Sequence, residues 1–188
     1  MKRLFFALWP DGAWSARLRD AAAPVLAAAG GRAPAPHDLH VTLCFLGAVG
    51  EAQLAMLCER AAKIEAVAFE LAFDGLALWR TARMVVASAA RVPTAGAALS
   101  AALVSAAREA GLAPEVRSWR PHVTLLRGVA PQFLPPPATS AGDSWPLAPL
   151  TLPASRFYLA QSQGLGAQAC GAMEARRYAT LASWPLRA

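Results

Sequence analysis

The sequence predicts an α+β protein with antiparallel strands, built from two related halves. Segments with strand and helix patterns are interleaved along the chain, without the steady one-to-one alternation that produces a doubly wound parallel sheet. The tetrapeptide His-Val-Thr-Leu occurs twice, at residues 40–43 and 122–125, and a loop precedes each copy. This internal repeat indicates that each half supplies one strand to a shared central cleft.

Length and composition favour one globular unit. The chain has 188 residues, of which 56% are hydrophobic and only 16% are charged, so it has ample apolar material for a buried core. We therefore expect a single domain over residues 1–188 and a monomer. Because no apolar run approaches the roughly 20 residues that a membrane helix needs, no membrane association is expected.

Cysteine usage and charge narrow the class of protein further. Cys44, Cys58 and Cys170 are an odd set without C-x-x-C spacing, which argues against a zinc site or a disulfide framework and fits a reducing cytoplasm. The formal net charge is +6, and Lys2 and Lys63 are the only lysines among the 18 basic residues. This arginine excess suits phosphate binding, but it is equally typical of a chain-wide compositional bias, since no concentrated basic tract is present.

The first part of the chain alternates strand and helix patterns. Residues 2–9 combine aromatic and aliphatic side chains and end at a Pro-Asp-Gly turn, which predicts a strand. Residues 13–29 have apolar positions at helical spacing and stop at two glycines. After a loop with two prolines, β-branched and aromatic residues predict a strand at 39–47, and residues 51–66 return to a helical pattern.

The middle of the chain predicts two strands and a helix. Residues 69–73 and 84–89 have strand patterns, and they flank an apolar segment at 76–79. Residues 95–110 are rich in alanine and are followed by a glycine, which predicts a helix with a glycine stop.

The last third predicts three strands and one irregular segment. The second His-Val-Thr-Leu repeat opens a strand at 122–128. Residues 131–149 are rich in proline, so we expect a surface loop there. The chain closes with expected strands at 154–161 and 177–185.

The repeated tetrapeptide places matched polar groups on two strands. Side chains two apart on a strand share a face, so His40 and Thr42 should point one way while Val41 and Leu43 point to the core. In the second copy His122 and Thr124 repeat this arrangement. A lone His-x-Thr is a weak motif, and a lone threonine fits a half-buried strand without any functional role, whereas a full repeat is not expected by chance.

Two facing imidazoles and two hydroxyls suit the hydrolysis of a strained cyclic phosphodiester. An imidazole titrates near pH 6.5, so one histidine of the pair can be neutral while the other is protonated, and the two can accept and donate a proton. Thr42 and Thr124 can donate to phosphate oxygens, and the guanidinium of Arg127 can offset their negative charge. Arg127 also fits a surface position at a strand end. No metal and no cofactor are required.

Residues beside the motifs have structural alternatives. His37 has no counterpart near His122 and is assigned to a loop. Asp38 can orient a neighbouring histidine or cap a turn, and turn capping is the usual role of an aspartate there. Trp9 and Trp119 lie close to the motifs and are the candidates for stacking against a base, although tryptophans more often pack in the core.

These segments together resemble a known family. The opening residues 3–8, the block 39–47, the block 121–127 and the closing residues 178–186 are similar to those of the bacterial and archaeal RNA 2',3'-cyclic phosphodiesterases, also called 2'-5' RNA ligases, of the two-histidine phosphoesterase superfamily. The resemblance implies a bilobal, pseudo-twofold fold in which two antiparallel sheets form a central cleft and helices pack outside.

The resemblance also implies a reaction and a role for each site residue. RNA with a 2',3'-cyclic phosphate end, or a cyclic nucleotide, would be opened to a 2'-phosphate. His40 would be the proton donor to the departing 3' oxygen and His122 the proton acceptor for water, while Thr42, Thr124 and Arg127 would bind the phosphate. Two alternatives stay open: 2'-5' RNA ligation through the same site, and a non-catalytic protein that binds RNA ends.

Overall fold

All the described strands belong to one antiparallel sheet. The computed structural model describes residues 1–115, 117–130, 144–163 and 176–188. The strand order is β6-β3-β4-β5-β2-β1-β7-β8, and every neighbouring pair is antiparallel. The predicted α+β class with antiparallel pairing is therefore confirmed. The strands are β1 (Lys2–Leu8), β2 (Val41–Val49), β3 (Phe69–Trp79), β4 (Met84–Ser88), β5 (His122–Arg127), β6 (Ser144–Ala154), β7 (Arg156–Ser162) and β8 (Tyr178–Pro185).

The expectation of two separate sheets needs correction. Two groups of four strands, β6-β3-β4-β5 and β2-β1-β7-β8, are joined through β5 and β2. This junction is narrow, because Val41 and Val123 are its only Cα partners among the described residues. The halves are therefore continuous in hydrogen bonding, and the two motif strands form the seam between them.

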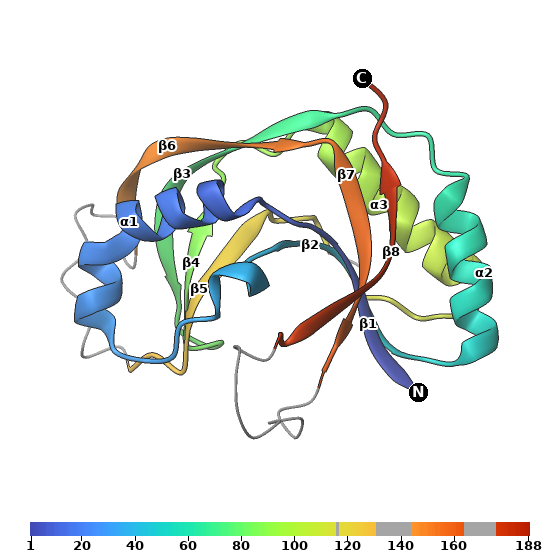
Figure 1. Cartoon of the computed structure of the whole chain (residues 1–188), viewed down its shortest axis with the longest axis horizontal. Helices are drawn as coiled ribbons and strands as arrows, with labels where there is room; N and C mark the ends of the chain where they lie inside the picture. Colours follow the sequence, from blue (N-terminus) through green and yellow to red (C-terminus); the bar gives the residue numbers. More distant parts are fainter. Residues whose placement is uncertain (116, 131–143, 164–175) are drawn as a thin grey trace.

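In the described part of the chain, three α-helices flank the sheet at two ends of the molecule. Helix α1 (Gly12–Ala29) packs against β5 and β6, whereas α3 (Thr94–Glu109) packs against β2 and α2 (Glu51–Ala62) packs against α3 and β8. Figure 1 shows α1 at one end and α2 with α3 at the other. A short 3-10 helix, η1 (Pro36–Asp38), leads into β2. No helix in the described part of the chain is long and apolar enough to span a membrane.

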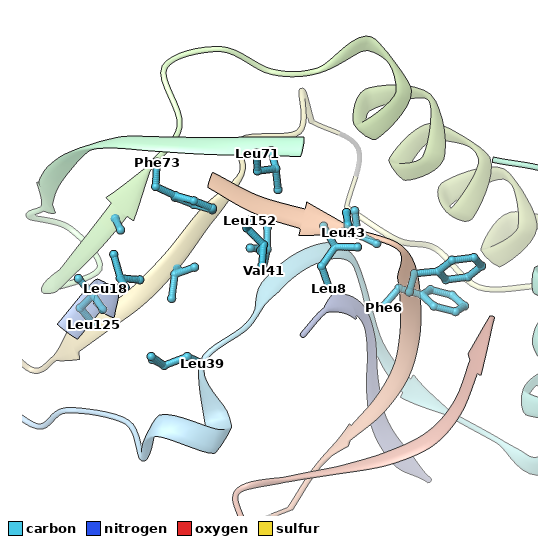
Figure 2. Packing of buried hydrophobic residues seen from close by; sticks show 14 of the residues in the cluster. Phe6, Leu8, Leu18, Leu39, Val41, Leu43, Leu71, Phe73, Leu125 and Leu152 are labelled. Carbon is cyan, nitrogen blue, oxygen red and sulfur yellow. The ribbon is translucent and has the colours of Figure 1, made fainter. Parts of the chain in front are cut away.

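One hydrophobic cluster joins the elements around the seam. Figure 2 shows Leu18 of α1, Val41 of β2, Phe73 of β3, Leu125 of β5 and Leu152 of β6 within it. Each of these side chains is buried. Burying a side chain of this size contributes roughly 1.5–3 kcal/mol, so the cluster gives the motif strands a rigid support.

Three elements differ from the sequence prediction by more than two residues. β3 runs unbroken from Phe69 to Trp79 where two segments were expected, with a register shift between Phe73 and Gly75. α2 ends at Ala62 instead of residue 66. Residues 144–149 belong to strand β6 and not to an irregular loop, while residues 131–143 of the expected loop lie outside the described residues.

The prolines of β6 are compatible with its place in the sheet. β6 contains Pro146, Pro149 and Pro153 and lies at one edge of the strand order. Proline cannot donate a backbone hydrogen bond, which an edge strand tolerates where that side faces solvent. Side chains along β6 largely alternate between buried and exposed positions, as in a strand with one face towards the core.

Candidate active site

The two repeated motifs lie side by side at the seam of the sheet. His40 immediately precedes β2, and His122 is the first residue of β5. Val41 and Val123 are fully buried, whereas both histidines and both threonines are only partly buried. The predicted alternation is confirmed, with apolar residues facing the core and polar residues facing the opposite side.

Each histidine is held by the backbone in the same way. Nδ1 of His40 donates to the carbonyl oxygen of Asp38 at 2.7 Å, and Nδ1 of His122 donates to the carbonyl oxygen of Arg120 at 2.8 Å. In both cases the acceptor lies two residues earlier in the chain. Because a carbonyl only accepts, Nδ1 carries the proton, and the lone pair of a neutral ring is on Nε2. The ring nitrogen that is not bonded to the backbone carbonyl is thus Nε2 in both halves.

Aromatic side chains fix the two rings unequally. Trp9 stacks on His40 with ring centroids 5.0 Å apart and an interplanar angle of 24°, and Tyr178 contacts His40 edge-on at 4.8 Å. His122 has one aromatic neighbour within the described residues, Trp79, at 4.4 Å. His40 is therefore the more enclosed of the two imidazoles.

Burial lowers the pKa of both histidines. For His40 desolvation lowers the pKa from 6.5 to about 4, with smaller contributions from the positive charge of Arg127 and from His122 and Arg177. Burial also lowers the pKa of His122, and Arg117 and Arg127 add to this effect. In each ring the hydrogen bond to the carbonyl acts in the opposite direction. Both shifts favour the neutral form of the imidazole at pH 7.

Two cavities flank the histidines, and each combines residues of both motifs. A cavity of about 490 Å³ is lined by His122 and by Thr42 of the other motif. A smaller cavity of about 200 Å³ is lined by His40, Thr124 and Arg127. The structure therefore brings all five predicted site residues to the seam, where each cavity is lined by residues from both motifs.

The backbone of Arg127 is anchored beside the smaller cavity. Its N–H donates to the carbonyl oxygen of Arg32 at 3.0 Å, and its own carbonyl oxygen accepts from the N–H of Arg32 at 2.9 Å. One guanidinium nitrogen, Nη1, donates to Sδ of Met84 at 3.3 Å. Arg127 therefore lies at the site, although its predicted contact with a phosphate stays a prediction.

The structure assigns Asp38 a different contact from those expected. Its backbone carbonyl, and not its carboxylate, holds His40. Both carboxylate oxygens accept from the backbone N–H of Arg177 at 3.2 Å, which joins two segments 139 residues apart. Nε2 of His37 lies 3.9 Å from this carboxylate. Asp38 thus stabilises a long-range contact beside the small cavity.

The two tryptophans named from sequence have clear structural contacts. Nε1 of Trp9 donates to the carbonyl oxygen of His37 at 2.8 Å while its ring covers His40. Nε1 of Trp119 donates to the carbonyl oxygen of Thr42 at 2.8 Å, and its ring packs edge-on against Phe69. Both tryptophans support motif residues, and stacking against a base stays a prediction.

Three residues at the site gave no signal in the sequence. Trp79 lies at the end of β3, Arg32 precedes η1 and Arg177 precedes β8, so all three reach the motifs only through tertiary structure. No group of three or more His, Cys, Asp or Glu side chains with metal-binding geometry occurs within the described residues. Cys44 and Cys58 are free thiols, and Cys170 lies outside the described residues.

Comparisons with known proteins define the class to which this fold and site belong. The family model described as LigT-like phosphoesterase matches residues 8–86, which include the first motif. RNA 2',3'-cyclic phosphodiesterase of Escherichia coli (strain K12) is 34% identical over 130 residues, which cover 68% of this chain and 72% of that protein. The protein of the same name from Archaeoglobus fulgidus is 34% identical over 74 residues, covering 39% and 42%.

A solved structure extends the likeness to the whole fold. The crystal structure of E. coli LigT complexed with 3'-AMP matches with a TM-score of 0.80 and 27% identity, covering 98% of each chain. The chain therefore belongs to the family of LigT-like phosphoesterases, and it is an enzyme.

Proposed function

We propose that this protein hydrolyses RNA 2',3'-cyclic phosphate ends to 2'-phosphates without a metal or a cofactor. The observation that carries the proposal is the twinned pair of imidazoles, His40 and His122, each tied through Nδ1 to a carbonyl two residues upstream. This leaves Nε2 of both rings for the substrate. The names of the E. coli and A. fulgidus relatives support the same reaction.

The two imidazoles would divide the proton transfers. A neutral His122 accepts a proton from the attacking water through Nε2, and a protonated His40 gives one to the departing 3' oxygen. The bond from water oxygen to phosphorus forms as the bond from phosphorus to the 3' oxygen breaks. The product is a 2'-phosphate with a free 3' hydroxyl, and the two histidines end with their protonation states exchanged.

Thr42, Thr124 and Arg127 would bind the phosphate throughout the reaction. Thr42 and Thr124 each line a cavity together with the histidine of the other motif, and their hydroxyls would donate to non-bridging oxygens. Arg127 lines the cavity of His40 and Thr124, where a guanidinium would stabilise the negative charge that accumulates on those oxygens.

The depressed pKa values suggest how the acid acquires its proton. The neutral form of His122 is ready to act as a base, but burial lowers the pKa of His40 to about 4, so its protonated form is scarce at neutral pH before the substrate binds. A bound phosphodiester adds a negative charge beside the ring and raises the pKa of His40. Substrate binding should therefore take up a proton.

We also propose that the whole chain, residues 1–188, acts as a single domain and a monomer.

Two alternatives use the same site. The first is 2'-5' RNA ligation, in which a 5' hydroxyl replaces water; bulk water favours hydrolysis, so ligation is secondary. The second is a protein that binds RNA ends without turnover, which would not need a pair of histidines held in equivalent ways.

One assay separates these functions. The purified protein is incubated with adenosine 2',3'-cyclic phosphate and with an RNA ending in a cyclic phosphate, in the presence of EDTA. Formation of a product that carries a 2'-phosphate and a free 3' hydroxyl supports the proposal. Activity that disappears in EDTA and returns with a divalent ion contradicts the mechanism. A 2'-5' linked product formed with a 5'-hydroxyl RNA supports ligation, and tight binding without product supports the binder.

A further inference from the structure

The small cavity beside His40 contains more arginine than one phosphate requires. Its volume of about 200 Å³ is close to that of about seven liquid waters at about 30 Å³ each, which exceeds the space of a single phosphate group. Arg32, Arg127 and Arg177 all line it. Arg127 lies with His40 and Thr124, the residues assigned above to the reacting phosphate, so Arg32 and Arg177 have no role in that assignment.

The backbone holds both additional arginines in place. Arg32 exchanges two hydrogen bonds with Arg127, and Gly31 before it has a positive φ of 99°. A β-carbon at Gly31 would lie 2.9 Å from the carbonyl oxygen of Arg127, so glycine permits this close pairing. Arg177 is fixed by its N–H, which donates to both carboxylate oxygens of Asp38. Their side chains therefore start from fixed points on opposite segments of the cavity wall.

The charge around this cavity is unbalanced. Asp38 is the only acidic residue that lines it in the described part of the chain, and its carboxylate accepts from the backbone of Arg177. None of the ion pairs found among the described residues involves Arg32, Arg127 or Arg177. The positive charges of Arg127 and Arg177 also act on His40, whose pKa they lower. Three guanidinium groups with one carboxylate favour a ligand with more than one negative charge.

We propose that Arg32 and Arg177 bind the internucleotide phosphate on the 5' side of the terminal nucleotide, so that the enzyme prefers RNA ends to cyclic mononucleotides. This inference rests on the proposed function. A 2',3'-cyclic mononucleotide carries one negative charge, whereas an RNA end carries the next phosphate along the same strand. An arginine fork binds such a phosphate through two parallel hydrogen bonds.

Three substrates test the proposal: adenosine 2',3'-cyclic phosphate, the same nucleotide with a 5'-phosphate, and the dinucleotide ApA with a 2',3'-cyclic phosphate end. Wild-type kcat/KM should be about tenfold or more higher for the second and third substrates, as expected for one hydrogen bond to a charged group. Arg177→Ala and Arg32→Ala should each lower this advantage by roughly tenfold. On the substrate with one phosphate both variants should lose clearly less kcat/KM than on the other two substrates.

Arg176→Ala is the matched control. Arg176 is the exposed neighbour of Arg177 and lines a different cavity, so its loss changes the net charge equally without altering the proposed contact. The advantage should persist in this variant. If Arg177→Ala fails to fold, Arg177→Lys replaces it, since lysine keeps the charge but loses the fork, and the advantage should fall several-fold.

The outcomes distinguish a failure of this inference from a failure of the proposed function. Equal wild-type kcat/KM on all three substrates overturns the inference, as does an Arg177 variant that loses activity equally on all three, because the arginine would then serve the reacting phosphate. A protein that turns over none of the substrates contradicts the proposed function instead.

Discussion

Gly96 should be required for the position of Trp119, and through it for the geometry of the first motif. Gly96 lies in the first turns of α3, directly under the indole of Trp119. A β-carbon added there would lie 2.5 Å from Cζ3 of Trp119 and 2.9 Å from Cε2 of Phe69. Ordinary contacts begin near 3.4 Å, so the indole must move by roughly 1 Å. Its hydrogen bond to the carbonyl oxygen of Thr42 would then be broken or lengthened.

The change in the free energy of unfolding combines two destabilising effects and one stabilising effect. Overpacking a core costs about 1–3 kcal/mol, and an unpaired buried carbonyl costs about another 1–3 kcal/mol, whereas alanine gains up to about 1 kcal/mol over glycine in a helix. Gly96→Ala should therefore lower the free energy of unfolding by about 1–5 kcal/mol. That corresponds to a fall in Tm of roughly 2–20 °C for a chain of this size.

Activity should fall in the same variant. A misplacement of about 1 Å at reacting groups lowers the rate on the order of 10²-fold. Thr42 is linked to the displaced indole only through one hydrogen bond, so a smaller loss of about tenfold in kcat/KM is expected. The measurements are thermal unfolding and hydrolysis of a cyclic phosphate.

Gly12→Ala is the control for Gly96→Ala. Gly12 is the first residue of α1, and a β-carbon there would have no atom within 4 Å. This change should leave activity intact and raise stability by about 0.4–1 kcal/mol. Equal Tm and kcat/KM in the two alanine variants would refute the role of the Trp119 contact.

Three further perturbations have expected results. Arg127→Ala should lower kcat by on the order of 10²-fold on a cyclic phosphate, and wild-type kinetics would remove Arg127 from the site. Gly31→Ala should lower Tm, because its φ of 99° and the nearby Arg127 carbonyl both disfavour a β-carbon; an unchanged Tm contradicts this. The free energy of unfolding of the wild type should fall by up to about 3 kcal/mol as the pH is lowered from 6.5 to 4, compared with its value at pH 8. The reason is that His40 binds a proton at its ordinary pKa of 6.5 in the unfolded chain but only near pH 4 in the folded chain. His40→Gln should flatten this pH dependence in urea unfolding, and an identical curve would show that the pKa of His40 is not lowered.

The parts of the fold and site that sequence predicts are those with local causes. The full repeat of His-Val-Thr-Leu predicted two matched strands, and alternation alone predicted that Val41 and Val123 face the core, whereas the histidines are only partly buried. Glycines after the first and third predicted helices marked their ends within a residue or two.

The parts that sequence does not predict depend on tertiary position. The prolines of β6 indicate a loop unless the strand is known to be at an edge of the sheet. The single bridge between Val41 and Val123, which makes one sheet out of two halves, has no local signature. The same holds for Arg177 and Trp79, which reach the motifs from distant strands.

The most direct test of the two-histidine mechanism is turnover of an RNA 2',3'-cyclic phosphate by His40→Ala, His122→Ala and the double variant, between pH 5 and 9. Each positioned acid or base contributes roughly 10²- to 10⁴-fold, so each single variant should lose at least that factor in kcat, and the double variant should be little worse because the pair acts as a unit. Wild type should show a bell-shaped pH profile. The remaining histidine, His37, has its ring beside the Asp38 carboxylate, and His37→Ala should stay near wild type. A single variant of His40 or His122 that keeps more than about a tenth of wild-type activity would contradict the account.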